Sequence, residues 1–134
     1  MTTKTSIYPH GLNRFADLVG LRFTECGDGR CSAEVDVRDD LFHPGGVVHG
    51  GVAFALADST MATGLLATLE GGQNASTIEL KISFLAPVRG GVMTAESWIV
   101  KRGRRIAFAE AKVSCGEILV ATATATFAIV DRKQ

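Results

Sequence analysis

Asp58 is the residue of this sequence that points most directly to chemistry. It interrupts a stretch from Val52 to Leu69 that is otherwise mainly apolar. A carboxylate has poor helix propensity, and burying it without a partner costs on the order of a few kcal/mol. One explanation is structural, with a compensating hydrogen bond to Ser59, Thr63 or a neighbouring strand. The other is a general base or nucleophile whose basicity is set by burial.

A short motif before this stretch offers a second chemical group. His49, Gly50 and Gly51 lie at the predicted start of the helix, where the first helical amides have no intrahelical acceptor. Such amides can bind the negative oxygen that develops on an attacked carbonyl. A Gly-Gly pair also serves simply for a sharp turn or close packing. His49, like His43 six residues earlier, has both a structural and a catalytic interpretation.

The spacing of these groups sets a condition on any shared reaction. Gly50 and Asp58 are eight residues apart, which corresponds to roughly 12 Å along a helix. One helix therefore cannot bring both groups to the same carbonyl. A catalytic interpretation predicts an obligate homodimer in which Gly50 of one subunit faces Asp58 of the other. A purely structural Asp58 makes no such demand.

Basic residues gather in two predicted turns. The hairpin Lys101-Arg102-Gly103-Arg104-Arg105, together with Arg89, holds five of the fourteen Lys and Arg residues. Charged hairpin tips are commonly just solvated. The alternative is a phosphate site for an anionic ligand, because the forked donors of arginine suit phosphate oxygens.

The composition is that of an ordinary globular protein. The 134 residues are 46% hydrophobic and 21% charged, with 14 basic and 14 acidic side chains, so we expect one domain over residues 1–134. Balanced charge gives no field to attract nucleic acid or an anionic membrane. The spacing of Cys26, Cys31 and Cys115 fits neither a zinc motif nor a disulfide framework. No signal or membrane segment is evident, and these features predict a cytoplasmic protein.

The elements that position these residues follow from the pattern of apolar side chains. The segment Gly27-Asp28-Gly29 predicts a hairpin between strands over Leu21 to Cys26 and Arg30 to Val37. From 39 to 51 no periodicity is present, which indicates a loop. Four apolar residues at helical spacing predict a short N-terminal helix ending near Gly20: Leu12, Phe15, Ala16 and Val19.

The rest of the chain predicts one long helix and a sheet. The stretch 52–69 is apolar on nearly every side, as in a helix enclosed by other structure, and Gly71-Gly72 ends it. Alternation from Thr77 to Phe84 predicts a strand, and alanines on one face of the last two strands leave room for a helix. The fold class is α+β, with an antiparallel sheet of five to six strands wrapped around one long helix. The last three strands form a meander: Val92 to Arg102, Arg105 to Cys115 and Glu117 to Val130.

Several motifs in order resemble the hotdog-fold acyl-CoA thioesterases, specifically the phenylacetate-degradation (PaaI-type) branch. The resemblance covers roughly Leu12 to Val130. Its strongest parts are Val48-His49-Gly50-Gly51, Ala55-Leu56-Ala57-Asp58, the segment Thr77 to Pro87, Arg102-Gly103-Arg104-Arg105 and the segment Ala121 to Phe127.

The resemblance implies hydrolysis of an acyl-CoA thioester without a metal or a separate cofactor, since CoA is part of the substrate. It also implies a homodimer with continuous sheets, often paired into a tetramer. By position, Asp58 resembles the carboxylate that activates water or attacks the carbonyl. The Gly50 amide would polarise the thioester oxygen, and Thr77 would help to orient the water or the carboxylate. Contacts to substrate or CoA are implied for Gly51, Arg89, Arg102, Arg104 and Arg105.

One position departs from the pattern of this branch. The family commonly has Asn where this chain has His43, six residues before His49, and both histidines are candidate catalytic residues. A histidine here also resembles the hotdog dehydratases, so a hydroxyacyl-CoA dehydratase is an alternative, and a non-catalytic acyl-CoA sensor is a third. The resemblance favours aromatic acyl groups, with short and medium fatty acyl groups close behind. Candidate acyl-pocket residues are Phe54, Met61 and Leu65.

Overall fold

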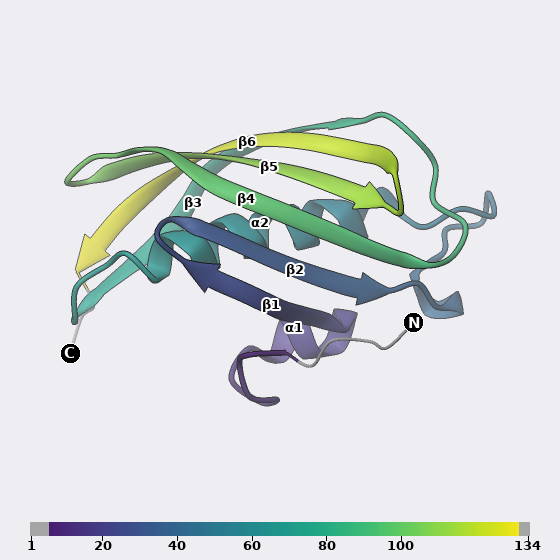
Figure 1. The fold of residues 1–134 in the computed structure, drawn as a ribbon, viewed down its shortest axis with the longest axis horizontal. Coiled ribbons are helices and arrows are strands. Elements are labelled where there is room, and N and C mark those ends of the chain that lie inside the picture. Colours follow the sequence, from purple (N-terminus) through teal and green to yellow (C-terminus); the bar gives the residue numbers. More distant parts are fainter. Residues whose placement is uncertain (1–5, 132–134) are drawn as a thin grey trace.

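The computed structural model describes residues 6–131 and shows one curved antiparallel sheet that wraps around one long helix (Figure 1). The strand order is β1-β2-β4-β5-β6-β3, which leaves β3 at one edge. This confirms the predicted α+β architecture. The elements are α1 (Arg14–Val19), β1 (Leu21–Gly27), β2 (Arg30–Asp36), the 3-10 helix η1 (Asp39–Leu41), α2 (Gly50–Leu66), β3 (Gln73–Phe84), β4 (Val92–Arg102), β5 (Ile106–Cys115) and β6 (Ile118–Asp131).

Helix α2 begins two residues earlier and ends three residues earlier than the sequence predicts. Its N-cap is His49, whose side chain accepts a hydrogen bond from the Gly51 amide. At the other end, the Thr68 amide donates to the Leu65 carbonyl at 2.9 Å. This bond spans three residues, the 3-10 pattern that is common in the last turn of an α-helix. Among residues 6–131, neither helix combines the length and apolarity that crossing a bilayer requires.

The hairpin between β1 and β2 corrects the interpretation of the cysteines. Asp28 and Gly29 have φ angles of 54° and 76°, the left-handed pair that a two-residue hairpin turn needs. This turn sets Cys26 directly opposite Cys31, and the two form a disulfide with a Cα–Cα distance of 4.1 Å. The sequence spacing did not reveal the pair because strand register, not spacing, brings them together. The cysteine argument for an intracellular protein therefore fails, and a cytoplasmic location stays a prediction.

The core lies between the sheet and α2. The alanines of β5 and β6 that face inward are at most 4% exposed, and their small side chains let the helix lie close to the sheet, as predicted. From the helix, Leu56, Met61 and Leu65 are fully buried against them.

One face of α2 is open in this chain, contrary to the expectation of a fully enclosed helix. Phe54 and Leu66 are 39% and 41% exposed, and Asp58 is half-buried between them. Asp58 follows Phe54 by four residues and precedes Leu66 by eight, so at 3.6 residues per turn all three lie on one side of the helix. Helix α1 is similarly uncovered, since Ala16 is buried while Phe15 is 57% exposed.

The buried face of α2 predicts a large stability effect. Leu56→Ala is expected to lower the free energy of unfolding by about 3 kcal/mol, because it removes three carbons from a fully buried position and leaves a cavity. Urea denaturation measures this, with Leu66→Ala as the matched control on the open face. Equal losses for both variants would contradict the assignment of the two faces.

Candidate active site

Asp58 lies on the open face of α2, and β3 holds its carboxylate in place. The Thr77 hydroxyl donates a hydrogen bond of 2.8 Å to Asp58 Oδ1. The sequence suggested Ser59, Thr63 or a neighbouring strand as the partner of Asp58, and the structure shows that the neighbouring strand supplies it. Within the described residues Oδ2 has no hydrogen-bond partner, so it is free to accept a proton or to attack a carbon.

The amides at the start of α2 differ in their partners. The His49 amide donates to the Leu41 carbonyl at 2.8 Å, the Gly51 amide to His49 Nδ1 at 2.8 Å, and the Val52 amide to the His49 carbonyl at 3.0 Å. The Gly50 amide has no acceptor in the part of the chain described by the structure. Because a helix N-terminus carries partial positive charge, this amide can bind an anionic oxygen.

The Gly51 amide is not available to a ligand, because it donates its hydrogen bond to His49 Nδ1. A Cβ at residue 51 would lie 2.9 Å from the same nitrogen. Gly51 is therefore required by the cap itself. The resemblance implied a contact between Gly51 and the substrate, but within this chain the Gly51 amide is not free to make one.

Phe84 is a site residue that the sequence reasoning missed. A Cβ built on Gly50 would lie 3.0 Å from Phe84 Cζ, so this ring explains why residue 50 is a glycine. Phe84 is 56% exposed and forms an outer wall beside the Gly50 amide. Its register with Ala121 places it on the helix-facing side of β3, and the alternation of apolar residues along that strand was the available signal.

The two histidines lie beside Gly50 with similar hydrogen bonds. His43 Nδ1 accepts from the Gly45 amide at 2.8 Å, and His49 Nδ1 accepts from the Gly51 amide. Their ring centroids are 6.4 Å apart. Since Nδ1 is an acceptor in both rings, each neutral histidine presents Nε2–H as a donor. Both line a pocket of about 350 Å³ that also contacts Gly50 and Phe84.

The structure separates two groups of predicted site residues. Asp58 and Gly50 stay on one helix, eight residues apart, so in this chain they do not converge. Arg89 precedes β4, whereas Arg102 is its last residue and Arg104 and Arg105 follow it. An 11-residue strand is roughly 35 Å long, so these arginines form no single cluster within one chain.

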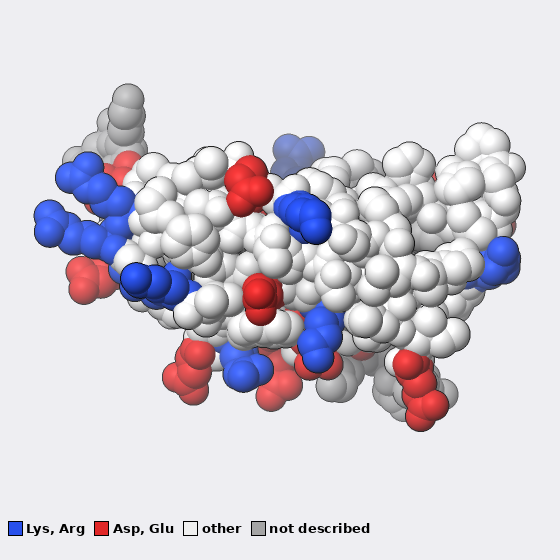
Figure 2. All heavy atoms as spheres, turned by 90° about the horizontal axis from the view of Figure 1, so that it is seen from above, with Lys and Arg blue, Asp and Glu red and all other residues white. Residues whose placement is uncertain are grey.

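The β4–β5 hairpin is the more strongly basic of the two turns. Figure 2 shows Lys and Arg side chains gathered at the left end of the molecule, where Figure 1 places this hairpin. A groove of about 560 Å³ there is lined by Lys101, Arg104 and Arg105 together with Ile106 and Phe108. The apolar pair was not predicted as part of this site. Both residues point away from the helix because they alternate with buried alanines.

The three candidate acyl-pocket residues on α2 separate into two kinds. Phe54 lies on the open face, whereas Met61 and Leu65 are fully buried in the core. Met61 and Leu65 therefore contact no ligand in this chain, and their prediction as pocket residues is wrong. The sequence did not distinguish them because the helix is apolar on nearly every side.

The arrangement contains the parts that ester or thioester hydrolysis needs. A carboxylate with one free oxygen can activate water or attack a carbonyl, and a free helix-terminal amide can bind the developing oxyanion. The Asp58 carboxylate and the Gly50 amide belong to the same helix but are eight residues apart along it. A second copy of the chain is the simplest way to bring them together.

Comparison with known proteins places this arrangement in a family. The sequence profile described as "Thioesterase superfamily" matches residues 45–122. A protein from Pseudomonas aeruginosa named "Putative esterase PA0474" is 33% identical over 83% of this chain and 84% of its own length. One from Saccharolobus solfataricus with a similar name is 30% identical over 67% of this chain, and the match spans 59% of that protein.

A solved structure extends the comparison to the whole fold. The phenylacetic acid degradation-related protein of Ralstonia eutropha, titled a putative thioesterase, is 32% identical with a TM-score of 0.80, covering 85% of this chain and 88% of its own. The fold is thus the hotdog fold, and the PaaI-type resemblance is confirmed. The chain belongs to the thioesterase superfamily.

Proposed function

We propose that this protein hydrolyses an acyl-CoA thioester to the free acid and CoA. The observation that supports this most directly is the Asp58 carboxylate, which Thr77 holds on the open face of α2 with one oxygen free. The Gly50 amide supplies the complementary group. No further cofactor is part of the proposal, because CoA belongs to the substrate.

The proposed reaction uses these two groups at the thioester carbonyl. Asp58 removes a proton from a water molecule, whose oxygen attacks the carbonyl carbon, and the Gly50 amide binds the oxyanion. The C–S bond then breaks, and the thiolate leaves and takes up a proton. In the alternative route, Asp58 itself attacks the carbonyl carbon, the C–S bond breaks with loss of the thiolate, and water hydrolyses the resulting anhydride. After a single turnover in ¹⁸O-water, ¹⁸O in Asp58 would identify this second route, with water attacking the aspartyl carbon of the anhydride.

A two-fold dimer would complete the site. The β3 edge carries Ile78, which is 55% exposed, and pairing two such edges in antiparallel fashion would join the sheets. Gly50 lies near Phe84, at one end of β3, and Asn74 lies at the other. Antiparallel pairing would therefore set Gly50 of one subunit near the part of its partner that holds Asp58 and the start of β3.

The same two-fold symmetry would bring Arg89 of one subunit close to the hairpin arginines of its partner. Arg89 belongs to the Gly50 end, because the neighbouring Val88 carbonyl accepts from the Val48 amide at 2.8 Å. The hairpin belongs to the Asn74 end, since the Ile129 amide bonds to the Arg105 carbonyl at 2.8 Å. One subunit's Arg89 would then face the end where its partner holds Arg102, Arg104 and Arg105. These side chains would bind the phosphates of CoA.

A tetramer is the further assembly that we propose. Ile106, Phe108 and Val130 are 37%, 45% and 43% exposed on strands β5 and β6. Burying this outer apolar surface between two dimers would give a dimer of dimers. Native mass spectrometry distinguishes the tetramer from the dimer.

The activity is tested by release of free thiol from a panel of aryl-acyl and straight-chain acyl-CoA esters. Rapid release is expected from the native protein. Change in enoyl-CoA absorbance without thiol release would instead indicate a dehydratase, and tight binding without either reaction would indicate an acyl-CoA sensor.

Thr77 is expected to act through Asp58. Thr77→Val removes the 2.8 Å hydrogen bond, and loss of a bond to a charged group is expected to lower kcat roughly tenfold or more, with little change in KM. Thr77→Ser keeps the hydroxyl and is the control. Equal kcat values for the Val and Ser variants would remove Thr77 from the mechanism.

The basic hairpin is expected to affect binding rather than chemistry. The double substitution Arg104→Ala with Arg105→Ala should raise KM for an acyl-CoA roughly tenfold, with little change in kcat. The same acyl group on pantetheine, which lacks the nucleotide phosphates, should show no such rise. Lys112→Ala, an exposed basic residue over the Trp98 ring, is the control. A matching rise for the pantetheine ester would contradict the phosphate assignment.

A further inference from the structure

A groove of about 820 Å³ lies where the N-terminal segment crosses the end of α2. Its walls come from elements far apart in sequence: the segment before α1 with the first residue of that helix, strand β1, the last turns of α2 and the start of β3. A volume of this size is typical of small-molecule sites. None of the residues placed in the reaction so far lines this groove.

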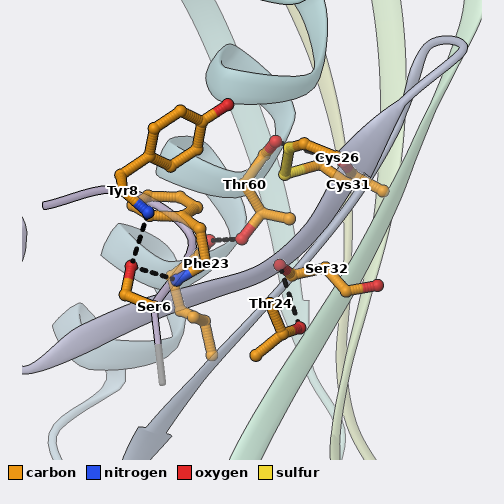
Figure 3. The surroundings of a disulfide bond; sticks show 10 residues. Ser6, Tyr8, Phe23, Thr24, Cys26, Cys31, Ser32 and Thr60 are labelled. Atoms are coloured by element: carbon orange, nitrogen blue, oxygen red, sulfur yellow. Dashed lines mark hydrogen bonds between the residues drawn. A yellow bond between two sulfur atoms is a disulfide. The ribbon is translucent and has the colours of Figure 1, made fainter. Parts of the chain in front are cut away.

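The apolar wall of the groove is fixed to the sheet. The Ile7 amide donates to the Phe23 carbonyl at 2.7 Å, and the Ser6 hydroxyl accepts from the amides of Phe23 and Tyr8 at 3.2 and 3.3 Å. The Tyr8 and Phe23 rings then meet edge to face, with centroids 5.5 Å apart. Figure 3 shows these rings together on the side of β1 that faces α2. This wall is therefore in place before any ligand arrives.

The groove begins near Asp58. Its α2 residues Thr63 and Leu66 follow Asp58 by five and eight residues, which is roughly 7.5 and 12 Å along the helix. On β3, Asn74 lines the groove three residues before Thr77, the partner of Asp58. An acyl chain that leaves a carbonyl at Asp58 and runs toward the end of α2 therefore reaches the groove with its far end.

The two asparagines that line the groove favour a ligand that accepts hydrogen bonds. Asn13 Oδ1 already accepts from the Ala16 amide at 3.0 Å, and Asn74 Oδ1 accepts from the Ala75 amide at 2.9 Å. Each side chain therefore offers its NH2 group to a ligand more readily than its oxygen.

Arg14 gives the groove a positive charge that the chain itself does not neutralise. No acidic residue lines the groove within residues 6–131, and no carboxylate there forms an ion pair with Arg14. The acidic residue of α1, Asp17, accepts from the Gly11 amide at 2.7 Å instead. The guanidinium of Arg14 is therefore available to an anionic ligand.

These walls fit an apolar chain that ends in a carboxylate. Tyr8, Phe23 and Leu66 provide the apolar contacts, and the forked donors of Arg14 match the two oxygens of a carboxylate. A phosphate ester carries up to about two negative charges at neutral pH. It would need a second cation, which the described lining lacks.

We propose that this groove binds the far end of the acyl group and that the enzyme acts on acyl-CoA esters whose acyl chain ends in a carboxylate. Arg14 is then a specificity-determining residue. The proposal rests on the proposed thioesterase function. It names a substrate class, the dicarboxylic acyl group, that differs from the aryl and fatty acyl groups favoured by the resemblance.

The test compares esters that differ only at the far end of the acyl chain. Adipoyl-, suberoyl- and sebacoyl-CoA end in a carboxylate, whereas hexanoyl-, octanoyl- and decanoyl-CoA end in a methyl group at the same chain lengths. For at least one length the wild type should have the higher kcat/KM for the carboxylate ester. Arg14→Gln should lower the ratio of the two values roughly fivefold, and Arg14→Lys, which keeps the charge without the fork, should fall between them.

Two controls separate the groove from a general effect of charge. Lys112→Gln removes a positive charge from an exposed position on β5 outside the groove and should leave the ratio unchanged. Raising the ionic strength should lower the wild-type ratio, because Arg14 is exposed and its pairing is screened by salt. A preference for the methyl-ended ester at all three lengths would overturn the proposal. So would an unchanged ratio in Arg14→Gln, or an equal fall in Lys112→Gln.

A binding measurement separates this proposal from the proposed reaction. Non-hydrolysable thioether analogues of the paired esters, with a methylene between sulfur and carbonyl, are titrated by calorimetry. Tighter binding of the carboxylate-ended analogue by the wild type, lost in Arg14→Gln, supports the groove even if no ester is hydrolysed. Equal or weaker binding of that analogue by the wild type would overturn the groove while leaving hydrolysis standing.

Discussion

Asp58→Asn is expected to lower kcat for acyl-CoA hydrolysis by roughly 100-fold to 10,000-fold, the range for loss of a general base. The amide keeps the shape of the side chain and can still accept the hydrogen bond from Thr77. It cannot take a proton from water or attack a carbonyl. The dimer should persist, because the substitution is isosteric and leaves the open face of α2 otherwise intact.

The control for this prediction is another carboxylate on the neighbouring strand. Glu79 lies on β3 and accepts a hydrogen bond of 2.7 Å from the Thr126 hydroxyl on the outer face of the sheet. Glu79→Gln makes the same chemical change away from the helix and should keep full turnover. If Asp58→Asn retained most of its thiol release, Asp58 would have only the structural role that its bond to Thr77 provides.

Gly50→Pro is expected to lower kcat by roughly 100-fold to 1,000-fold, the usual effect of removing one oxyanion donor. Proline lacks the N–H group but is well tolerated at the first position of a helix, which Gly50 occupies. The residue before it, His49, is already non-helical, and its ψ of 135° lies in the range that a residue before proline adopts. The helix should therefore form as before.

Gly50→Ala provides the matched control for the amide. It keeps the N–H and adds only a Cβ, which meets the Phe84 ring as the proline ring also does. The difference in kcat between the two variants thus measures the amide itself. Equal kcat values would mean that crowding against Phe84 accounts for the whole effect and that the amide is not a donor in the reaction.

Mixing the two inactive proteins tests whether one site uses both subunits. In a mixed dimer of Asp58→Asn and Gly50→Pro chains, one of the two sites combines a native Asp58 with the partner's native Gly50. Random exchange should then restore about a quarter of wild-type turnover, since half of the dimers are mixed and each has one intact site. Absence of any recovery, with exchange verified by mass spectrometry, would contradict a site shared across the interface.

Local patterns predicted the elements of this fold well because the patterns are themselves local. The turn residues on either side of the run Val92 to Arg102 predicted the observed bounds of β4, and the small alanines of β5 and β6 predicted a helix close to the sheet. The ends of α2 were less accurate, since His49 caps the helix through a side-chain hydrogen bond that apolar periodicity does not contain. The buried Met61 was taken for a pocket residue because the helix is apolar on nearly every side.

The amino-acid sequence by itself determined the fold class, the family resemblance, and the prominence of Asp58 and Gly50, because these depend on residue types and short spacings. Tertiary structure decided the rest. Strand register paired Cys26 with Cys31, and the neighbouring strand gave Asp58 its partner Thr77. The path of the chain brought Tyr8 beside Leu66 in one groove. Such contacts join residues distant in sequence, and they exist only once burial of the core has fixed how the elements pack.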